Sequence, residues 1–137
     1  MSFLLDTNVI SEIRKGDRCH RAVLAWWNAT DDSKVFLSVL VVGEIQNGIE
    51  RLFRVDPPKA QQFEKWLKSI TQAFHGRILP VDLDTGKAWG KMTSKRTIPV
   101  IDGLLAATAV THNLTLVTRN TKDIQDTGAS YLNPFEP

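Results

Sequence analysis

The sequence predicts an α/β fold in which a central, mostly parallel sheet of about four or five strands is flanked by helices on both faces. Short apolar, often β-branched runs alternate along the chain with longer amphipathic segments, which indicates strands alternating with helices. The apolar runs are continuous, as is typical of parallel strands buried on both faces. The 137 residues contain no linker or repeat, so we expect one domain spanning residues 1–137.

Five elements are expected in the first half of the chain: a strand at 3–5, a helix ending at Gly16, a helix at 17–28, a strand at 35–39 and a helix at 41–53. The first strand is the apolar run that stops at Asp6. Thr7 or Asn8 is the expected cap of the helix that follows. Glu44 falls in the first turn of the helix at 41–53.

The second half begins with the break at Pro57 and Pro58. The next helix is amphipathic, because five large apolar residues recur at helical spacing: Phe63, Trp66, Leu67, Ile70 and Phe74. Pro80 marks residues 78–81 as an edge strand. Asp84 is expected to cap a helix that runs to Arg96. The last elements are an Ala-rich helix at 102–113 and strands at 114–118 and 129–132.

The net charge of +2 is unevenly distributed. Residues 51–96 contain ten basic and four acidic side chains, so the middle of the chain is basic and its flanks are acidic. A basic segment of this kind binds phosphate backbones or forms solvated helix faces. Cys19 is the only cysteine, which excludes an internal disulfide and a cysteine metal cluster; we favour a buried thiol over a nucleophile beside His20. No apolar run is long enough for a membrane span and no signal segment opens the chain, so we expect a cytoplasmic protein.

Four acidic residues lie in apolar surroundings at the ends of predicted elements: Asp6, Glu44, Asp102 and Asp123. Each alone is explained as a helix cap or a partner of the helix dipole. Ligands of parallel sheets bind at the carboxyl ends of the strands, and there the four carboxylates would repel one another. A hard divalent cation such as Mg²⁺ or Mn²⁺ resolves that repulsion, because it prefers oxygen ligands.

Motifs for several other chemistries are absent. Residues 86–93 have one residue too few between the glycines for a Walker A loop, and there is no G-x-G-x-x-G, G-x-S-x-G or H-E-x-x-H pattern. Asp6-Thr7-Asn8 invites comparison with aspartyl-phosphate phosphatases, which generally carry a second Asp where this chain has Asn8. A phospho-receiver domain normally shows an acidic pair that is also missing.

Four segments together resemble the PIN-domain family, in particular VapC-type toxins and their FitB-like relatives. They are Leu4 to Glu12, Ser38 to Ile45, Ile101 to Ala109 and Leu116 to Ile124. Their order and spacing match the family over essentially the whole chain. The resemblance implies a three-layer PIN-like fold.

The same resemblance implies a Mg²⁺- or Mn²⁺-dependent endoribonuclease that hydrolyses RNA phosphodiester bonds with metal-activated water. Asp6, Glu44 and Asp102 would be the core acids that hold the metal, with Asn8 and Thr118 as polar supports. Many relatives have Asp where this chain has Asn120. Either Asn120 completes the cluster with a neutral oxygen, or Asp123 supplies the fourth acid.

The resemblance also implies partners. A VapB-like antitoxin would inhibit the toxin, operator DNA would be bound only through that antitoxin, and the toxin would form a homodimer away from membranes. Lys91, Lys95 and Arg96 are our candidates for guiding RNA. The alternative is a FitB-like scaffold that acts mainly in a DNA-binding repressor complex and has little nuclease activity. One or two of the large aromatic side chains, Trp26, Trp27, Phe53 and Trp66, are expected to line a groove for an antitoxin segment.

Overall fold

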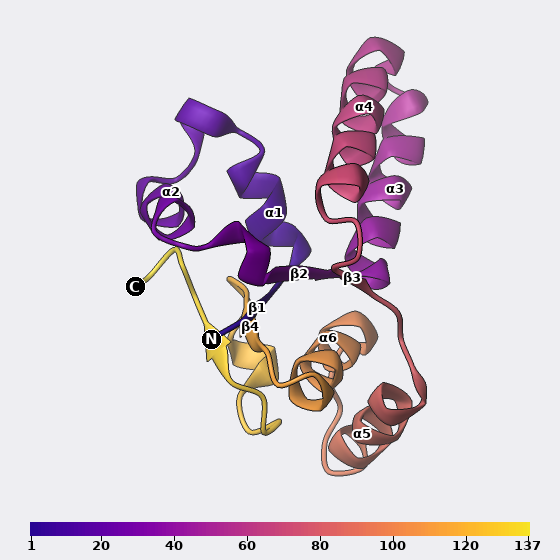
Figure 1. Cartoon of the computed structure of the whole chain (residues 1–137). Helices are drawn as coiled ribbons and strands as arrows, with labels where there is room; N and C mark the ends of the chain where they lie inside the picture. Colours follow the sequence, from indigo (N-terminus) through magenta and orange to yellow (C-terminus); the bar gives the residue numbers. More distant parts are fainter.

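A five-stranded parallel sheet forms the centre of the computed structural model, which describes all residues 1–137 (Figure 1). Its strands are β1 (Phe3–Leu5), β2 (Val35–Ser38), β3 (Ile78–Leu79), β4 (Thr115–Val117) and β5 (Tyr131–Leu132). They are arranged in the order β3-β2-β1-β4-β5, and every neighbouring pair is parallel. The α/β class and the parallel sheet are confirmed. The first strand of the chain is central, so its carboxyl end lies between those of β2 and β4.

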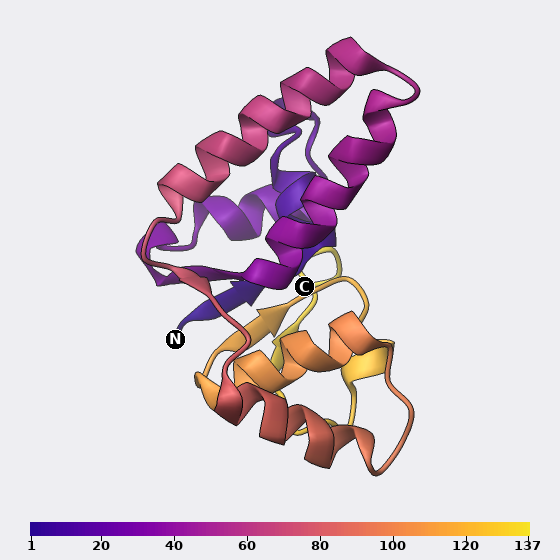
Figure 2. The same ribbon diagram turned by 90° about the vertical axis from the view of Figure 1, so that its right-hand side faces the viewer.

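Helices cover both faces of this sheet and complete the three layers. They are α1 (Thr7–Ile13), α2 (Arg21–Asn28), α3 (Val39–Phe53), α4 (Pro57–Ala73), α5 (Leu83–Thr93) and α6 (Val100–Thr111). Figures 1 and 2 show α1, α2 and the α3–α4 hairpin on one side, and α5 and α6 on the other. None of these helices combines the length and the apolar composition needed to cross a membrane.

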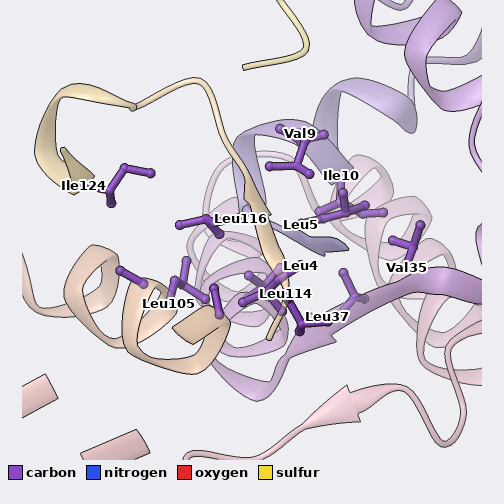
Figure 3. Packing of buried hydrophobic residues seen from close by; sticks show 14 of the residues in the cluster. Leu4, Leu5, Val9, Ile10, Val35, Leu37, Leu105, Leu114, Leu116 and Ile124 are labelled. Carbon is purple, nitrogen blue, oxygen red and sulfur yellow. The ribbon is translucent and has the colours of Figure 1, made fainter. Parts of the chain in front are cut away.

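The hydrophobic core is a cluster of 24 buried residues on both faces of the sheet (Figure 3). Leu4 and Leu5 are adjacent in β1 and both are fully buried, so side chains on opposite faces of the same strand are excluded from water. Leu37 of β2 and Leu116 of β4 flank them in the core. Burying one such side chain contributes about 1.5–3 kcal/mol, so the continuous apolar runs account for a sheet covered on two sides.

Several helix starts differ from the expectation, because an earlier acidic or polar side chain caps the helix. Asp6, rather than Thr7 or Asn8, caps α1 by accepting from the Thr7 N–H. Asp82, rather than Asp84, caps α5 by accepting from the Thr85 N–H. The Ser38 side chain likewise caps α3.

Three further helix boundaries differ from the expectation. Helix α3 begins at Val39, so Glu44 lies beyond the first turn in which we expected it. The helix expected at 17–28 is divided into a 3₁₀ turn at Gly16–Arg18 and α2, which the His20 ring caps. Helix α6 begins at Val100, so Asp102 is its third residue rather than its first.

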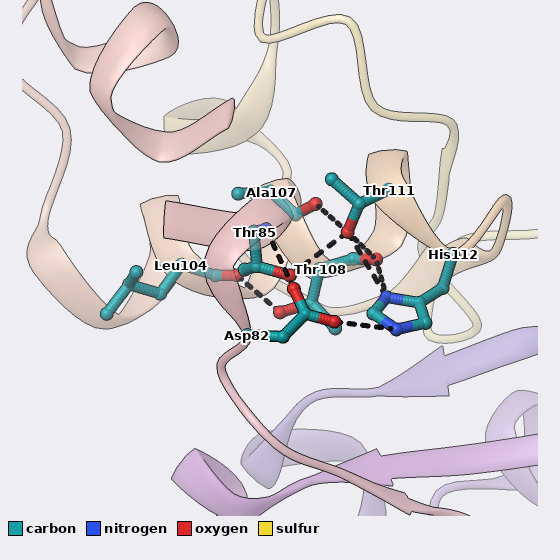
Figure 4. A network of polar contacts seen from close by, with 7 residues as sticks. All are labelled: Asp82, Thr85, Leu104, Ala107, Thr108, Thr111 and His112. Carbon is teal, nitrogen blue, oxygen red and sulfur yellow. Dashed lines mark hydrogen bonds and ion pairs between the residues drawn. The ribbon is translucent and has the colours of Figure 1, made fainter. Parts of the chain in front are cut away.

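A polar network joins α5 to α6 on the face of the sheet that these two helices cover (Figure 4). The Asp82 carboxylate accepts from the Thr85 N–H at 2.8 Å and lies 3.5 Å from the His112 ring. The Thr85 and Thr111 hydroxyls are hydrogen-bonded at 3.0 Å. The backbone N–H of Thr85 lowers the pKa of Asp82, so this carboxylate stays ionised as a cap. The network anchors α6, whose opposite end carries Asp102.

Candidate active site

Asp6 is at the carboxyl end of the central strand and is 6% exposed. Three donors hold its carboxylate: the Thr7 N–H at 2.7 Å, the Thr118 hydroxyl at 2.7 Å and the Asn8 amide at 3.3 Å. Thr118 follows β4 and is 1% exposed, so its hydroxyl ties the ends of two adjacent strands together. The Asn8 side-chain oxygen in turn accepts from the Arg119 N–H at 3.1 Å. Asp6, Asn8 and Thr118 therefore lie together, in the arrangement that the sequence predicted.

Glu44 reaches the same edge from the second turn of α3. Its carboxylate accepts from the Thr7 hydroxyl at 2.6 Å and is otherwise exposed. Thr7 thus contacts two acids, because its N–H donates to Asp6 and its hydroxyl to Glu44. The sequence had suggested only a capping role for Thr7. Its position directly after a strand-end acid was the signal that could have revealed this second contact.

Asp102 and Asp123 are joined by the side chain of Asn120. The Asn120 amide donates to Asp102 at 3.1 Å and to Asp123 at 2.8 Å. Its backbone N–H donates to the Thr118 hydroxyl, which connects this pair to Asp6. The sequence left open whether Asn120 or Asp123 belongs to the cluster; the structure brings both of them to it.

None of the four carboxylates of the cluster forms an ion pair with a basic side chain. The chain has two ion pairs, Lys15–Glu12 and His112–Asp82, and neither involves the four acids. Arg119 is adjacent in sequence, but its guanidinium stacks over Phe135 at 4.5 Å. Burial raises the pKa of Asp102 to about 6, with additional contributions from the charges of Asp6, Asp123 and Glu44; the hydrogen bond from Asn120 partly opposes the rise. The four acids are therefore electrostatically coupled.

The donor set suits a hard divalent cation, because it consists of carboxylate and amide oxygens. As the side chains are placed, no three of the acids are close enough to ligate one ion. The Asn120 amide lies between Asp102 and Asp123, and Thr7 holds Glu44. An ion would relieve the repulsion that contributes to the raised Asp102 pKa, and binding it would require Glu44 and Asn120 to adopt other rotamers. The residues present therefore fit Mg²⁺ or Mn²⁺.

Arg96 is bound to the backbone of the loop that carries Asp123. Its guanidinium donates to the Asp123 carbonyl at 2.8 Å and to the Gln125 carbonyl at 2.5 Å. We had expected Arg96 to guide RNA, together with Lys91 and Lys95. Lys91 and Lys95 are exposed and line a separate cavity beside α5. The structure therefore places Arg96 as a support for the Asp123 loop, whereas the two lysines stay available to solvent.

The Cys19 thiol is unsuited to nucleophilic chemistry. It is 8% exposed, and burial raises its pKa, which disfavours the reactive thiolate. It packs in the hydrophobic core and donates a hydrogen bond to the neighbouring His20 carbonyl at 3.5 Å. The interpretation of Cys19 as a buried thiol is confirmed.

Comparison with known proteins identifies the class to which this fold and acidic edge belong. Residues 3–129 match the model of the PIN domain family, and the chain therefore belongs to that family. Two curated relatives extend over nearly the whole length. The VapC ribonuclease Y4jK of Sinorhizobium fredii is 36% identical, with 98% of both chains covered. Toxin FitB of Neisseria gonorrhoeae is 34% identical, with 96% of this chain and 97% of FitB covered.

Solved structures agree with this placement. The crystal structure of FitAcB from Neisseria gonorrhoeae contains a chain that superposes with a TM-score of 0.89 at 33% identity, covering 98% of this chain and 99% of that one. A chain in the structure of FitAB bound to an IR36 DNA fragment superposes with a TM-score of 0.86 at 32% identity. The match covers 97% of this chain and 95% of that one. The resemblance to VapC and FitB toxins seen in the sequence is thereby confirmed.

Proposed function

We propose that the protein is the toxin of a type II toxin–antitoxin pair and acts as a divalent-metal-dependent endoribonuclease, with residues 1–137 forming a single PIN domain. The observation that carries this proposal is the set of four coupled carboxylates at the sheet edge, without a cation partner. The names of the relatives, a VapC ribonuclease and toxin FitB, support the same function.

Asp6 and Asp102 would hold the ion, and Glu44 and Asp123 would complete its surroundings. When bound, Mg²⁺ or Mn²⁺ would supply a Lewis acid that activates water and offsets the charge of the phosphate oxygens. Asn8 and Thr118 keep the Asp6 carboxylate fixed, and this preorganisation favours the transition state.

Glu44 is the residue we assign to proton transfer, because it is exposed at the rim and only one hydroxyl binds it. It would accept the proton of the attacking water, directly or through a second water. The water oxygen bonds to phosphorus as the bond from phosphorus to the 3′ oxygen breaks. The leaving oxygen takes a proton from solvent, so the products carry a 5′-phosphate and a 3′-hydroxyl.

The test is cleavage of a defined pool of single-stranded RNA by the purified chain in Mg²⁺, Mn²⁺ or EDTA. Asp6→Asn and Asp102→Asn should each reduce the rate at least 100-fold, whereas Asp84→Asn should retain it. Asp84 is the matched control, because it is an exposed acid near a helix start and lies outside the cluster. Equal rates for the three variants, or cleavage that persists in EDTA, would refute the metal-dependent mechanism.

We further propose that an antitoxin binds this chain, inhibits it and mediates any contact with operator DNA. Two similar structures, FitAcB and FitAB with DNA, are complexes and support this partner. They also favour a second candidate function, in which the chain is chiefly a scaffold of a repressor complex. Expression of the free chain separates the two, because a nuclease toxin inhibits growth until the antitoxin is co-expressed and a scaffold does not. We expect a homodimer, which size-exclusion chromatography with light scattering would test.

A further inference from the structure

An apolar groove begins at the acidic site and runs along α1. Its cavity of about 300 Å³ is bounded by Thr7 and Ser11 of α1, by residues 44–52 of α3, and by Phe63 and Trp66 of α4. Thr7 and Ser11 are four residues apart, so they share one face of α1. Because Thr7 and Glu44 belong to the acidic site, the groove opens directly onto it.

The opposite end of the groove adjoins a basic pocket. This pocket has a cavity of about 480 Å³ and is lined by Arg14, Lys15, Arg18, Lys59, Gln62 and Phe63. Phe63 lines both cavities, so the two adjoin at this ring. Arg14 caps the carboxyl end of α1 in helical conformation, three residues beyond Ser11 and about 10 Å along the helix axis from Thr7.

The cations of the basic pocket have little internal compensation. Lys15 is paired with Glu12 at 3.0 Å, whereas Arg14, Arg18 and Lys59 take part in neither ion pair of the chain. All three are exposed. The Arg14 guanidinium stacks on Phe63 at 4.2 Å, which orients its plane and leaves its N–H groups free to bind an anion.

We propose that the apolar groove and the basic pocket form one binding track for single-stranded RNA, which leads the strand into the acidic site. Phosphates bind Arg14, Arg18 and Lys59, and bases stack on the half-buried ring of Trp66, because the Arg14 guanidinium already covers Phe63. Sequence-tolerant binding of single strands combines these two features, a positive groove and aromatic platforms. The proposal rests on the proposed nuclease function, because it names the path of that enzyme's substrate.

The track replaces our earlier candidates for RNA contact. Lys91 and Lys95 lie beside α5, in the layer on the other side of the sheet (Figure 1). The basic pocket lies instead at the end of α1, in the layer that contains the apolar groove. Charge at both ends distinguishes the track from a purely apolar docking surface, since acids define one end and unpaired cations the other.

The test compares two triple variants that remove the same charge. One is Arg14→Gln, Arg18→Gln and Lys59→Gln; the other is Lys87→Gln, Lys91→Gln and Lys95→Gln, from exposed positions on and after α5. Anisotropy of a fluorescein-labelled single-stranded RNA of mixed sequence, in EDTA to prevent cleavage, gives Kd over a range of salt concentrations. Circular dichroism and thermal unfolding verify that both variants fold.

The pocket variant should bind about 10- to 100-fold more weakly at 0.1 M salt. The slope of log K against log salt should fall by about 2 in magnitude, because three phosphate contacts are lost. The α5 variant should keep the wild-type slope. An abasic oligonucleotide of equal length should bind wild type at least about tenfold more weakly than RNA, because it cannot stack.

An unchanged slope in the pocket variant, a reduced slope in the α5 variant instead, or no RNA binding by wild type would each overturn the track. If the pocket variant binds RNA normally but escapes inhibition by the antitoxin, the surface belongs to that protein partner and the proposal is wrong. Parallel cleavage assays separate the two levels of inference. If wild type does not cleave RNA but the pocket variant shows the expected loss of salt dependence, only the nuclease function is rejected. If wild type cleaves RNA and the pocket variant keeps the wild-type salt dependence, only the binding track is rejected.

Discussion

Replacing Asp102 with Asn should stabilise the protein at neutral pH, in the absence of divalent cations. Burial and three neighbouring acids hold the Asp102 pKa at about 6, above its ordinary value of 3.8. This difference corresponds to at most about 3 kcal/mol, and solvent screening of a partly exposed group reduces it to about 1–2 kcal/mol. The substitution removes the charge, and the new amide oxygen can still accept from Asn120.

The sign of the pH dependence follows from proton binding. Below pH 3.8 the acid is protonated in the folded and the unfolded chain, so the variant and wild type should be equally stable. From pH 3.8 to about 6 the folded chain binds the proton more tightly, so wild-type stability falls as the pH rises. The advantage of the variant should therefore appear across this interval and stay constant above it.

Urea unfolding in EDTA at pH 4, 5, 6 and 8 measures this difference, with Asp84→Asn as the control. A variant less stable than wild type at pH 8, or a difference that is equal at pH 4 and pH 8, would refute the argument from charge repulsion. Adding Mg²⁺ should then favour wild type, because a ligand at a 100-fold excess over its Kd stabilises the folded state by about 2.7 kcal/mol. A similar response of both proteins to Mg²⁺ would show that Asp102 does not hold the ion.

Three other substitutions test the supports of the site and of α6. Thr118→Val should lower the free energy of unfolding by about 1–3 kcal/mol, because it removes a buried donor to Asp6; a loss below 0.5 kcal/mol would contradict this. Arg96→Gln should speed amide hydrogen exchange in the loop at 122–127, because the guanidinium binds two carbonyls of that loop, and should not change exchange in the sheet. The control Lys95→Gln should leave exchange in both regions unchanged. Unaltered loop exchange in Arg96→Gln would show that Arg96 does not hold the loop. Trp89→Phe should change stability by less than about 1 kcal/mol, since relief of the buried, unpaired indole N–H offsets lost packing; calorimetry would reveal a larger loss if that N–H is hydrogen-bonded in solution.

The strand ends were the most predictable part of the molecule. The continuous apolar runs before Asp6 and Thr118 can be buried only in a sheet covered on both faces, and parallel strands bring their carboxyl ends to one edge. That rule is sufficient to place Asp6 beside Thr118, although 112 residues separate them. Glu44 and Asp102 follow from the same rule, since each lies near the start of a helix beside that edge.

Side-chain hydrogen bonds within the site were less predictable, because they depend on rotamers and on short turns. Asn120 is a neutral residue where an acid was expected, and only the 3₁₀ turn at Lys122–Ile124 brings Asp123 to its amide. Arg96 belongs to a basic segment, and its composition gives no sign that the guanidinium binds two carbonyls. Helix caps were misplaced by one or two residues, since Asp, Ser, Thr and Asn compete for the same role.

The order in which the chain is synthesised has a consequence for when the acid cluster can form. Asp6 is made first, whereas its neighbour Thr118 and the pair Asn120 and Asp123 are made more than 110 residues later. At about 5–20 residues per second, translation separates Asp6 from Asp123 by roughly 6–23 s. The unfinished chain lacks the β4 partner of its central strand throughout this interval. The proposed nuclease is therefore inert until the segment that contains Thr118, Asn120 and Asp123 has been made and has joined Asp6.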